Sequence, residues 1–200
     1  IQSASDKLKY LHCKNASGGE GNTVEYYYMR QQAEQKAYKW QFEKVTIPTP
    51  LTPGTYRIHR DPYYVHTTND SKTPNVGLEL GNSPYNGTYT WRVEQNADCT
   101  YSIYLLDGST RLYFHTENNR VDASAPLKID LYNKEHAYSY RWLVTGSGQP
   151  NTYYLQLVAN PVDGYMHLYS HHLLYGTPLE IYRFVDVVDY VYQWTFEKVE

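Results

Sequence analysis

Histidine and tyrosine are the residues of this sequence whose types and spacing could do chemistry together. A tripeptide of tyrosine, an apolar residue and histidine occurs four times, and its histidines are His12, His66, His115 and His167. An imidazole can accept a hydrogen bond at one nitrogen while it donates at the other, and its charge changes near about pH 6.5. Four such groups predict either a buried hydrogen-bonding framework or a set of equivalent binding sites.

A second motif, Tyr-x-Trp, recurs in phase with the first and contains every tryptophan of the chain. Its members are Tyr38 and Trp40, Tyr89 and Trp91, Tyr140 and Trp142, and Tyr192 and Trp194. Both motifs return after roughly fifty residues, a period that indicates a repeated structural unit. We expect the tryptophans to be buried spacers between the repeats.

The segments between these motifs alternate apolar residues with other residues. Such runs follow the histidines at Val24–Tyr28, Val76–Leu80, Leu127–Leu131 and Leu179–Ile181, and others precede them at Tyr56–Ile58, Tyr101–Ile103 and Tyr153–Leu157. A period of two with turn residues between the runs predicts about four β-strands per repeat. No segment has a convincing helical pattern, so the predicted class is all-β.

The order of elements in each repeat resembles the ricin-B-like β-trefoil repeat. In the best match, Asp163–Val199, a strand ends in a polar residue, and a Gly-Thr-Pro turn, an apolar strand and Gln-Trp follow. The resemblance covers essentially the whole chain as four weak copies. It implies a β-trefoil built from four-stranded repeats, and the alternative is a four-bladed β-propeller, in which each repeat would be one blade.

A trefoil closes with three repeats, whereas this chain has four. Three prolines lie between Thr46 and Gly54, directly after the first repeat, and proline stiffens a connection. We therefore expect residues 1–46 to be a single trefoil-type repeat, 47–53 a Pro-rich linker and 54–200 a complete trefoil. An isolated repeat does not bury its apolar face, so 1–46 would close a preceding trefoil, or be exchanged within a homo-oligomer.

In ricin-type repeats the resemblance implies a sugar-binding carboxylate at the end of the second strand, held by a glutamine two residues before the tryptophan. Here the four histidines fill the carboxylate position, and Tyr38, Tyr89, Tyr140 and Tyr192 fill the glutamine position. The paired replacement predicts a girdle of hydroxyl–imidazole hydrogen bonds. Alternatively, each histidine lines a shallow sugar pocket with Tyr28, Tyr132 or Tyr182 as the stacking ring, and binding weakens as the pH falls through about 6.5.

The function that this resemblance implies is a non-enzymatic, lectin-like module for extracellular glycans or glycoproteins. No nucleophile motif, zinc-protease motif or phosphate loop is present, so we expect no catalytic residue and no cofactor. One alternative is a protein-binding trefoil, such as a protease inhibitor, acting through loops at Asn15–Asn22, Asn69–Asn75 and Asn118–Pro126. Another is a storage or structural protein, because 24 of the 200 residues are tyrosine.

The net charge and the processing signals limit the classes of partner and the cellular compartment that we expect. The net charge is −3 without a basic cluster, which excludes a nucleic-acid footprint, and no apolar run is long enough to span a membrane. Glycosylation sequons begin at Asn15, Asn69 and Asn86, which favours a secreted protein, and the start at Ile1 indicates a processed precursor or an excised fragment. Cys13 and Cys99 could form one disulfide or be two free thiols. His167, His171 and His172 cluster without cysteine, so we expect no metal site.

Overall fold

The chain divides into two units, Ile1–Thr46 and Ile47–Glu200. The computed structural model describes residues 9–13, 24–28, 51–82, 84, 87–160, 164–185 and 190–199. In the first unit β1 (Lys9–Cys13) pairs antiparallel with β2 (Val24–Tyr28), which confirms two predicted strands. Asn15, Tyr38 and Trp40 lie outside the described residues, and the assignment of 1–46 as a trefoil-type repeat stays a prediction.

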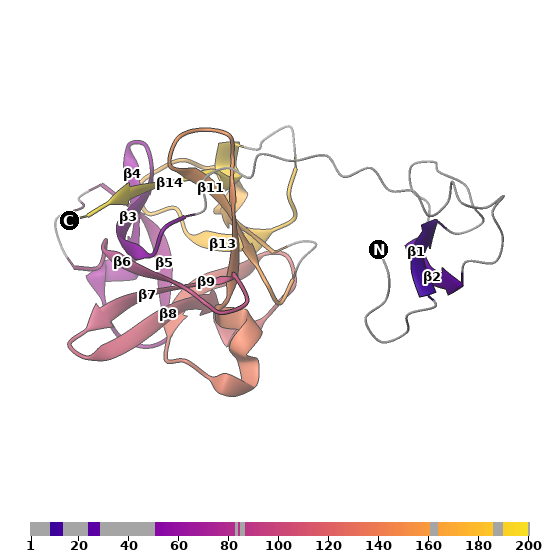
Figure 1. The fold of residues 1–200 in the computed structure, drawn as a ribbon. Helices are drawn as coiled ribbons and strands as arrows, with labels where there is room; N and C mark the ends of the chain where they lie inside the picture. Colours follow the sequence, from indigo (N-terminus) through magenta and orange to yellow (C-terminus); the bar gives the residue numbers. More distant parts are fainter. Residues whose placement is uncertain are drawn as a thin grey trace. The chain divides into compact units, whose positions relative to one another are not determined.

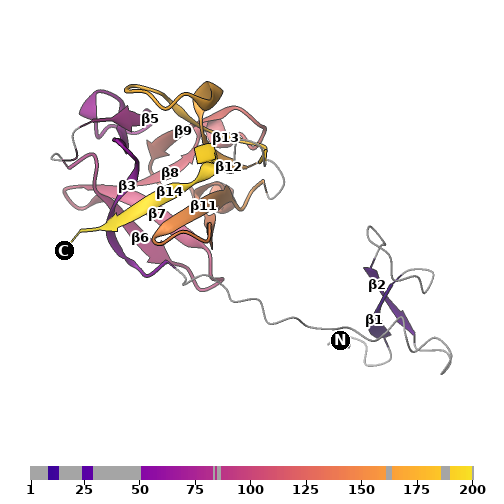
Figure 2. The same cartoon turned by 90° about the horizontal axis from the view of Figure 1, so that it is seen from above.

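Six strands of the second unit close into an antiparallel barrel. They are β3 (Gly54–Arg60), β6 (Trp91–Gln95), β7 (Tyr101–Asp107), β10 (Trp142–Gly146), β11 (Thr152–Leu157) and β14 (Trp194–Lys198). Each strand pairs with the next one in this order, and β14 pairs back to β3 (Figure 1 and Figure 2). Closure leaves the barrel without a free sheet edge.

Each repeat of this unit also carries a two-stranded hairpin between its two barrel strands. The hairpins are β4 (Tyr63–Thr67) with β5 (Val76–Gly81), β8 (Thr110–Thr116) with β9 (Ala125–Asp130), and β12 (Tyr165–Leu168) with β13 (Leu179–Tyr182). Strand β9 pairs with both β5 and β13, so the three hairpins meet at the end of the barrel where β3, β7 and β11 lead into them.

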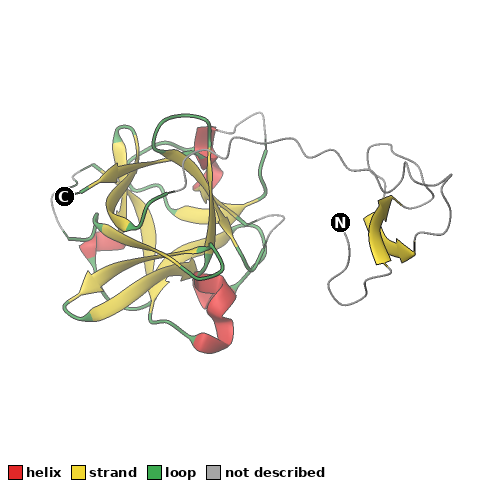
Figure 3. Ribbon diagram, in the orientation of Figure 1, coloured by secondary structure: helices red, strands yellow, loops and turns green. Residues whose placement is uncertain are grey.

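Three repeats therefore complete the second unit, and all of their paired strands belong to one continuous sheet. In a β-propeller each repeat would instead form a separate blade of four strands. The pairing of the described residues thus excludes the propeller alternative. Among the described residues of this unit the helical segments, red in Figure 3, are short 3-10 segments, so the all-β prediction is confirmed.

The turn after each hairpin histidine shows that the three repeats are in register. A 3-10 turn follows β4, β8 and β12, and these turns are η3 (Thr68–Asp70), η4 (Glu117–Asn119) and η6 (Tyr169–His171). In all three, the second and third residues have φ between 52° and 61°. Asparagine and aspartate tolerate this left-handed conformation best, and four of the six residues are of these types. A longer 3-10 segment, η5 (Lys134–Tyr140), precedes β10.

The tryptophans are buried between the repeats, as predicted. Trp91, Trp142 and Trp194 are fully buried, each at the start of a barrel strand. The indole of Trp91 donates to the carbonyl of Val65 at 3.0 Å, and that of Trp194 donates to the carbonyl of Met166 at 3.2 Å. Both carbonyls belong to the residue just before a motif histidine. These bonds tie each barrel strand to the hairpin of its own repeat.

The packed unit begins before the predicted boundary at residue 54. Leu51, inside the segment predicted as linker, is only 3% exposed and belongs to the apolar core, whereas Thr52 and Pro53 are exposed. Cys99 has an exposed, free thiol. Among the described residues there is no helix of the length and apolarity that crossing a membrane requires.

Candidate functional site

The motif histidines of the second unit are the next-to-last residues of equivalent hairpin strands, and all three are buried. His66, His115 and His167 are the fourth, sixth and third residues of β4, β8 and β12, each followed by the 3-10 turn. The ring nitrogens that lack a hydrogen-bond partner among the described residues are also inaccessible to solvent. Direct contact between these imidazoles and a sugar therefore has no support from the geometry. His12 is in β1, and its side chain lies outside the described residues.

Each of these histidines faces the tyrosine of the Tyr-x-Trp motif in its own repeat, as predicted, but through ring stacking. The ring centroids are 4.4 Å apart for His66 and Tyr89 and 5.0 Å for His115 and Tyr140, with interplanar angles of 2° and 16°. His167 and Tyr192 are 4.8 Å apart and tilted by 36°. Stacked rings use their faces, whereas an imidazole hydrogen bond lies in the plane of the ring.

The predicted hydroxyl–imidazole bond is not formed in the second and third repeats. Tyr192 donates its hydroxyl to the carbonyl of Arg183 at 2.6 Å, and neither ring nitrogen of His115 has a hydrogen-bond partner among the described residues. Burial raises the pKa of Tyr140, and it raises that of Tyr192 to about 12. These phenols are neutral at physiological pH. The histidines have other polar neighbours.

The polar neighbours of the histidines are carboxylates, which the sequence analysis did not predict. His66 Nδ1 lies 3.1 Å from Asp70 Oδ1 and His66 Nε2 lies 3.5 Å from Glu79 Oε1. His167 Nδ1 lies 3.2 Å from Glu180 Oε1, and His115 Nε2 lies 3.8 Å from Asp130 Oδ2. Glu79 and Glu180 face their histidines across the hairpin, at the same separation along the chain. This shared separation is the feature of the sequence from which the two glutamates could have been predicted to face the histidines.

The His115 environment differs because Lys128 occupies the cross-strand position that holds glutamate in the other two repeats. Lys128 Nζ is paired with Glu117 Oε1 at 2.6 Å. Burial lowers the pKa of His115, and the charge of Lys128 lowers it further, while Asp130 opposes both. His115 is therefore a neutral imidazole at pH 7, packed behind the Asp130 carboxylate.

Two tyrosines predicted as equivalent stacking rings, Tyr132 and Tyr182, occupy different positions. Tyr182 lies opposite Tyr165 in its hairpin, just as Asp130 lies opposite Tyr113, so Tyr182 corresponds to Asp130. It is half-buried, with its ring 5.3 Å from that of His167. Tyr132 comes two residues after Asp130 and is 47% exposed. The side chain of Tyr28 lies outside the described residues.

The first repeat has a glycine, Gly81, at the position of Asp130 and Tyr182. A Cβ at Gly81 would overlap the Tyr89 hydroxyl and lie 2.6 Å from His66 Nε2. The stacked His66–Tyr89 pair therefore occupies the space that a side chain would need. As a result, the first repeat presents no ring or carboxylate from this position.

Among the described residues, only those of the second repeat combine a carboxylate in contact with solvent and an exposed ring at this edge. We call Tyr113, His115, Asp130, Tyr132 and Tyr140 the β8–β9 cluster. The rings of Tyr113 and Tyr140 lie 5.7 Å and 5.3 Å from that of Tyr132 and hold it in place. The Asp130 side chain is 33% exposed and accepts the Leu131 N–H at 2.7 Å. This arrangement can stack a flat apolar face and accept hydrogen bonds beside it.

The remaining predicted positions add no further site. Asn69, one of the three predicted glycosylation residues, is exposed in η3, and Asn15 and Asn86 lie outside the described residues. Within the described part of the chain no three His, Cys, Asp or Glu side chains converge as metal ligands. His171 packs its ring 4.8 Å from that of His167.

The chain has structural neighbours but no sequence match. No family model and no curated protein matches it. A mosquitocidal holotoxin is 16% identical with a TM-score of 0.64 over 75% of this chain, which spans only 18% of the holotoxin chain. The designed three-fold symmetric protein ThreeFoil is 14% identical with a TM-score of 0.64, over 73% of this chain and 99% of ThreeFoil.

A ricin B-like lectin of Macrolepiota procera, solved in complex with lactose, is 11% identical with a TM-score of 0.59. The match covers 76% of this chain and the whole of the lectin chain. At these identities the likeness shows the fold alone. This chain thus has an all-β fold with a closed barrel, of a kind found in ricin B-like lectins and in a designed three-fold symmetric protein.

Proposed function

We propose that the second unit is a β-trefoil of the ricin-B type that binds glycans without catalysing a reaction. Its closed barrel, its three hairpins in register and its structural neighbours support the trefoil assignment. The lactose complex of one neighbour supports the ligand class. The sequons at Asn15, Asn69 and Asn86 favour action outside the cell on glycans or glycoproteins.

The observation that carries this proposal is the exposed Tyr132 ring beside the Asp130 carboxylate. An aromatic face stacks on the apolar C–H face of a sugar, and a carboxylate accepts hydrogen bonds from neighbouring hydroxyls more strongly than a neutral acceptor does. Asp130 is in contact with solvent, and the neutral His115 lies behind it. Histidine thus supports the carboxylate, where the sequence-based alternative had it bind the sugar itself.

The other two repeats are poorer candidates for sugar binding. In the first, Asp70 already accepts from His66 and from Thr88, the latter at 2.9 Å, and Gly81 supplies no ring. In the third, Glu180 is buried against His167 and Tyr182 is half-buried. We therefore assign one sugar site to the second unit. Its affinity is expected to be low, with avidity arising from oligomers, for which residues 1–46 are the proposed contact.

A glycan array followed by titration of the best sugar tests the proposal. Tyr132→Ala should weaken binding about 2–12-fold, the loss expected when a stacking contact worth about 0.5–1.5 kcal/mol is removed. Tyr175→Ala is the matched control, because Tyr175 is an exposed tyrosine in the third repeat, outside the β8–β9 cluster. Its binding should equal that of the unmodified protein.

A blank array with the folded protein would overturn the glycan proposal. Inhibition of a protease panel would then favour the protein-binding alternative. A negative result in both assays would favour a storage or structural role. Equal binding by Tyr132→Ala and the unmodified protein would leave a lectin but would contradict the β8–β9 site.

A further inference from the structure

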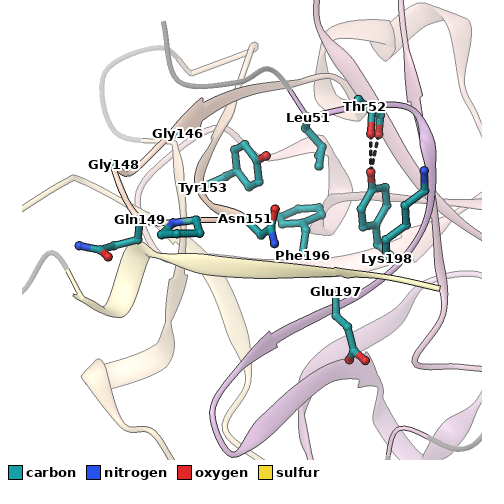
Figure 4. A pocket seen from close by; sticks show the side chains of 12 residues that line it. Leu51, Thr52, Gly146, Gly148, Gln149, Asn151, Tyr153, Phe196, Glu197 and Lys198 are labelled. Carbon is teal, nitrogen blue, oxygen red and sulfur yellow. Dashed lines mark hydrogen bonds between the residues drawn. The ribbon is translucent and has the colours of Figure 1, made fainter. Parts of the chain in front are cut away.

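A cavity of about 660 Å³ lies at the other end of the barrel, away from the three hairpins. At this end β3 and β11 begin and β10 and β14 end, so the cavity is bounded by the starts and ends of barrel strands and by the 146–151 loop (Figure 4). Its volume is within the roughly 300–1,000 Å³ of small-molecule sites. None of the β8–β9 cluster residues lines it.

The walls of the cavity include three aromatic rings. Tyr56 and Tyr153 occupy the same position in their repeats. Tyr56 comes three residues before His59, which pairs with Tyr64, and Tyr153 comes three residues before Gln156, which pairs with Tyr165. Tyr56 and Tyr153 both pack edge to face on Phe196, with ring centroids 5.7 Å and 5.5 Å away and interplanar angles of 72° and 87°. Tyr56, Tyr153 and Phe196 are core residues, only 4%, 8% and 2% exposed, so a ligand would contact the small apolar parts of these rings that line the cavity.

Tyr153 adds no negative charge to the cavity, and Tyr56 is held by a hydrogen bond. Tyr56 donates its hydroxyl to the carbonyl of Thr52 at 2.7 Å, and this bond holds the ring at the wall. Burial raises the pKa of Tyr153, and the neighbouring Tyr56 raises it further. Tyr153 is therefore a neutral phenol at pH 7.

Lys198 supplies a positive charge at the rim. Side chains alternate along a strand, so Lys198 shares the cavity side of β14 with Phe196. Glu197 also lines the cavity, but its side chain points away from the rings, as Figure 4 shows. Glu197 is engaged with Arg57 at 3.4 Å. The stem of Lys198 lies over Gly54, where a Cβ would be 3.5 Å from Lys198 Cε. Among the described residues no carboxylate is within ion-pair distance of Lys198.

We propose that this barrel-end cavity is a second binding site, for a small aromatic molecule that carries one anionic group. The ring of the ligand packs against the exposed apolar parts of Tyr56, Tyr153 and Phe196, and its carboxylate or sulfonate faces Lys198. Gln149 and Asn151 line the same cavity and offer amide groups at its edge. The site is independent of the glycan proposal, because it uses different residues at the opposite end of the barrel.

The test uses the full chain and the dye anilinonaphthalene sulfonate, whose fluorescence rises on transfer into an apolar site. We expect saturable binding of one dye per chain. Gln149→Trp, a change on an exposed loop, should fill the mouth and weaken binding about tenfold or more, since overfilling a site excludes its ligand. Lys198→Gln should weaken it about 2–5-fold, the size expected of an exposed charge pair.

Three controls separate this site from other dye-binding surfaces. Lys134→Gln removes an exposed lysine of η5, outside the cavity lining, and should leave the affinity unchanged. The uncharged analogue N-phenylnaphthylamine should bind Lys198→Gln and the unmodified protein equally. Tyr132→Ala should bind the dye normally, even though it is expected to bind the glycan more weakly.

Two results would overturn the proposal. One is the absence of saturable dye binding to the folded chain. The other is dye binding that neither Gln149→Trp nor Lys198→Gln weakens, because the dye would then occupy a different surface. The melting temperature of each variant, measured in parallel, establishes that the chain compared is folded.

Discussion

The environments of His115 and His167 occupy equivalent places in two repeats, yet only one of them faces solvent. In both, the histidine is the next-to-last residue of a hairpin strand, stacks on a buried tyrosine and has a carboxylate nearby. The Glu180 side chain is 7% exposed, whereas that of Asp130 is 33% exposed. The difference lies in the position of the carboxylate along the neighbouring strand.

Glu180 is directly opposite His167, whereas Asp130 is two residues past the residue opposite His115. A shift of two residues keeps a side chain on the same face of a strand and moves it about 7 Å along the strand. The shift brings Asp130 to the edge of the hairpin, where Tyr132 is exposed. The same buried framework can thus support a closed polar pair in one repeat and an open site in another.

The largest expected difference between the two environments is in stability. His167→Ala leaves the buried Glu180 carboxylate without its imidazole, and breaking a buried pair costs about 3–5 kcal/mol. His115→Ala should cost about 1–3 kcal/mol, because the partly exposed Asp130 can turn to water. Urea unfolding at pH 7 measures both free energies. Equal losses for the two variants would contradict the contrast between a closed and an open environment.

A smaller loss is expected from filling the corresponding position of the first repeat. Gly81→Ala places a methyl group against the Tyr89 hydroxyl and His66, and should destabilise the unit by about 1–3 kcal/mol. Gly108→Ala is a control for glycine replacement itself, since a Cβ there meets no atom within 4 Å, although its φ of 57° adds strain. Urea unfolding of both variants compares overlap with strain. A Gly81→Ala protein as stable as the unmodified one would show that the first repeat has room for a side chain.

The carboxylates themselves should differ in binding by a factor of a few. Asp130→Asn should weaken the best array glycan about 3–10-fold, because a charged acceptor makes the stronger hydrogen bond. Asp70→Asn, the matched change in the first repeat, should leave the affinity unchanged. Titration calorimetry of the two variants measures this. If Asp70→Asn has the larger effect, the sugar site belongs to the first repeat instead.

The smallest expected effect is a pH dependence from His115. Burial lowers its pKa in the folded protein, so the unfolded chain, with a histidine pKa of about 6.5, binds the proton more readily. This contribution to stability is complete above about pH 6.5 and declines as the pH falls below it, by at most about 1.4 kcal/mol per pH unit.

His115→Gln should therefore lose less stability between pH 7 and pH 5 than the unmodified protein does. Urea midpoints at the two pH values give the comparison. An unchanged pH dependence in the variant would mean that His115 takes up its proton equally in the folded and unfolded states.

The strands, the register of the repeats and the burial of the tryptophans could be predicted because each depends on local alternation repeated at one period. The partners of the histidines could not. Which residue faces a histidine across a hairpin depends on strand register, and the register differs by one pair between equally plausible turns. The stacking of Tyr89 on His66 likewise depends on Gly81, whose missing side chain carries no chemical signal in the sequence.

The exposure of Tyr132 was also beyond the sequence pattern. Tyr132 and Tyr182 both follow an apolar strand, and only the pairing of β9 with β8 and of β13 with β12 shows that they are not equivalent. The packing of Leu51 on the core, inside the predicted linker, could not be predicted for a related reason. Prolines mark a stiff segment, but they do not show whether the residue between them is packed on the core.

Backbone amide shifts of labelled protein during titration with the best array sugar test the central claim most directly. A site at the β8–β9 cluster predicts that the largest saturable changes fall on residues 113–115 and 130–133, with the equivalent residues 165–167 and 182–185 unmoved. Changes centred on the third repeat, or spread evenly over all three repeats, would contradict the claim that the sugar site lies in the second repeat alone.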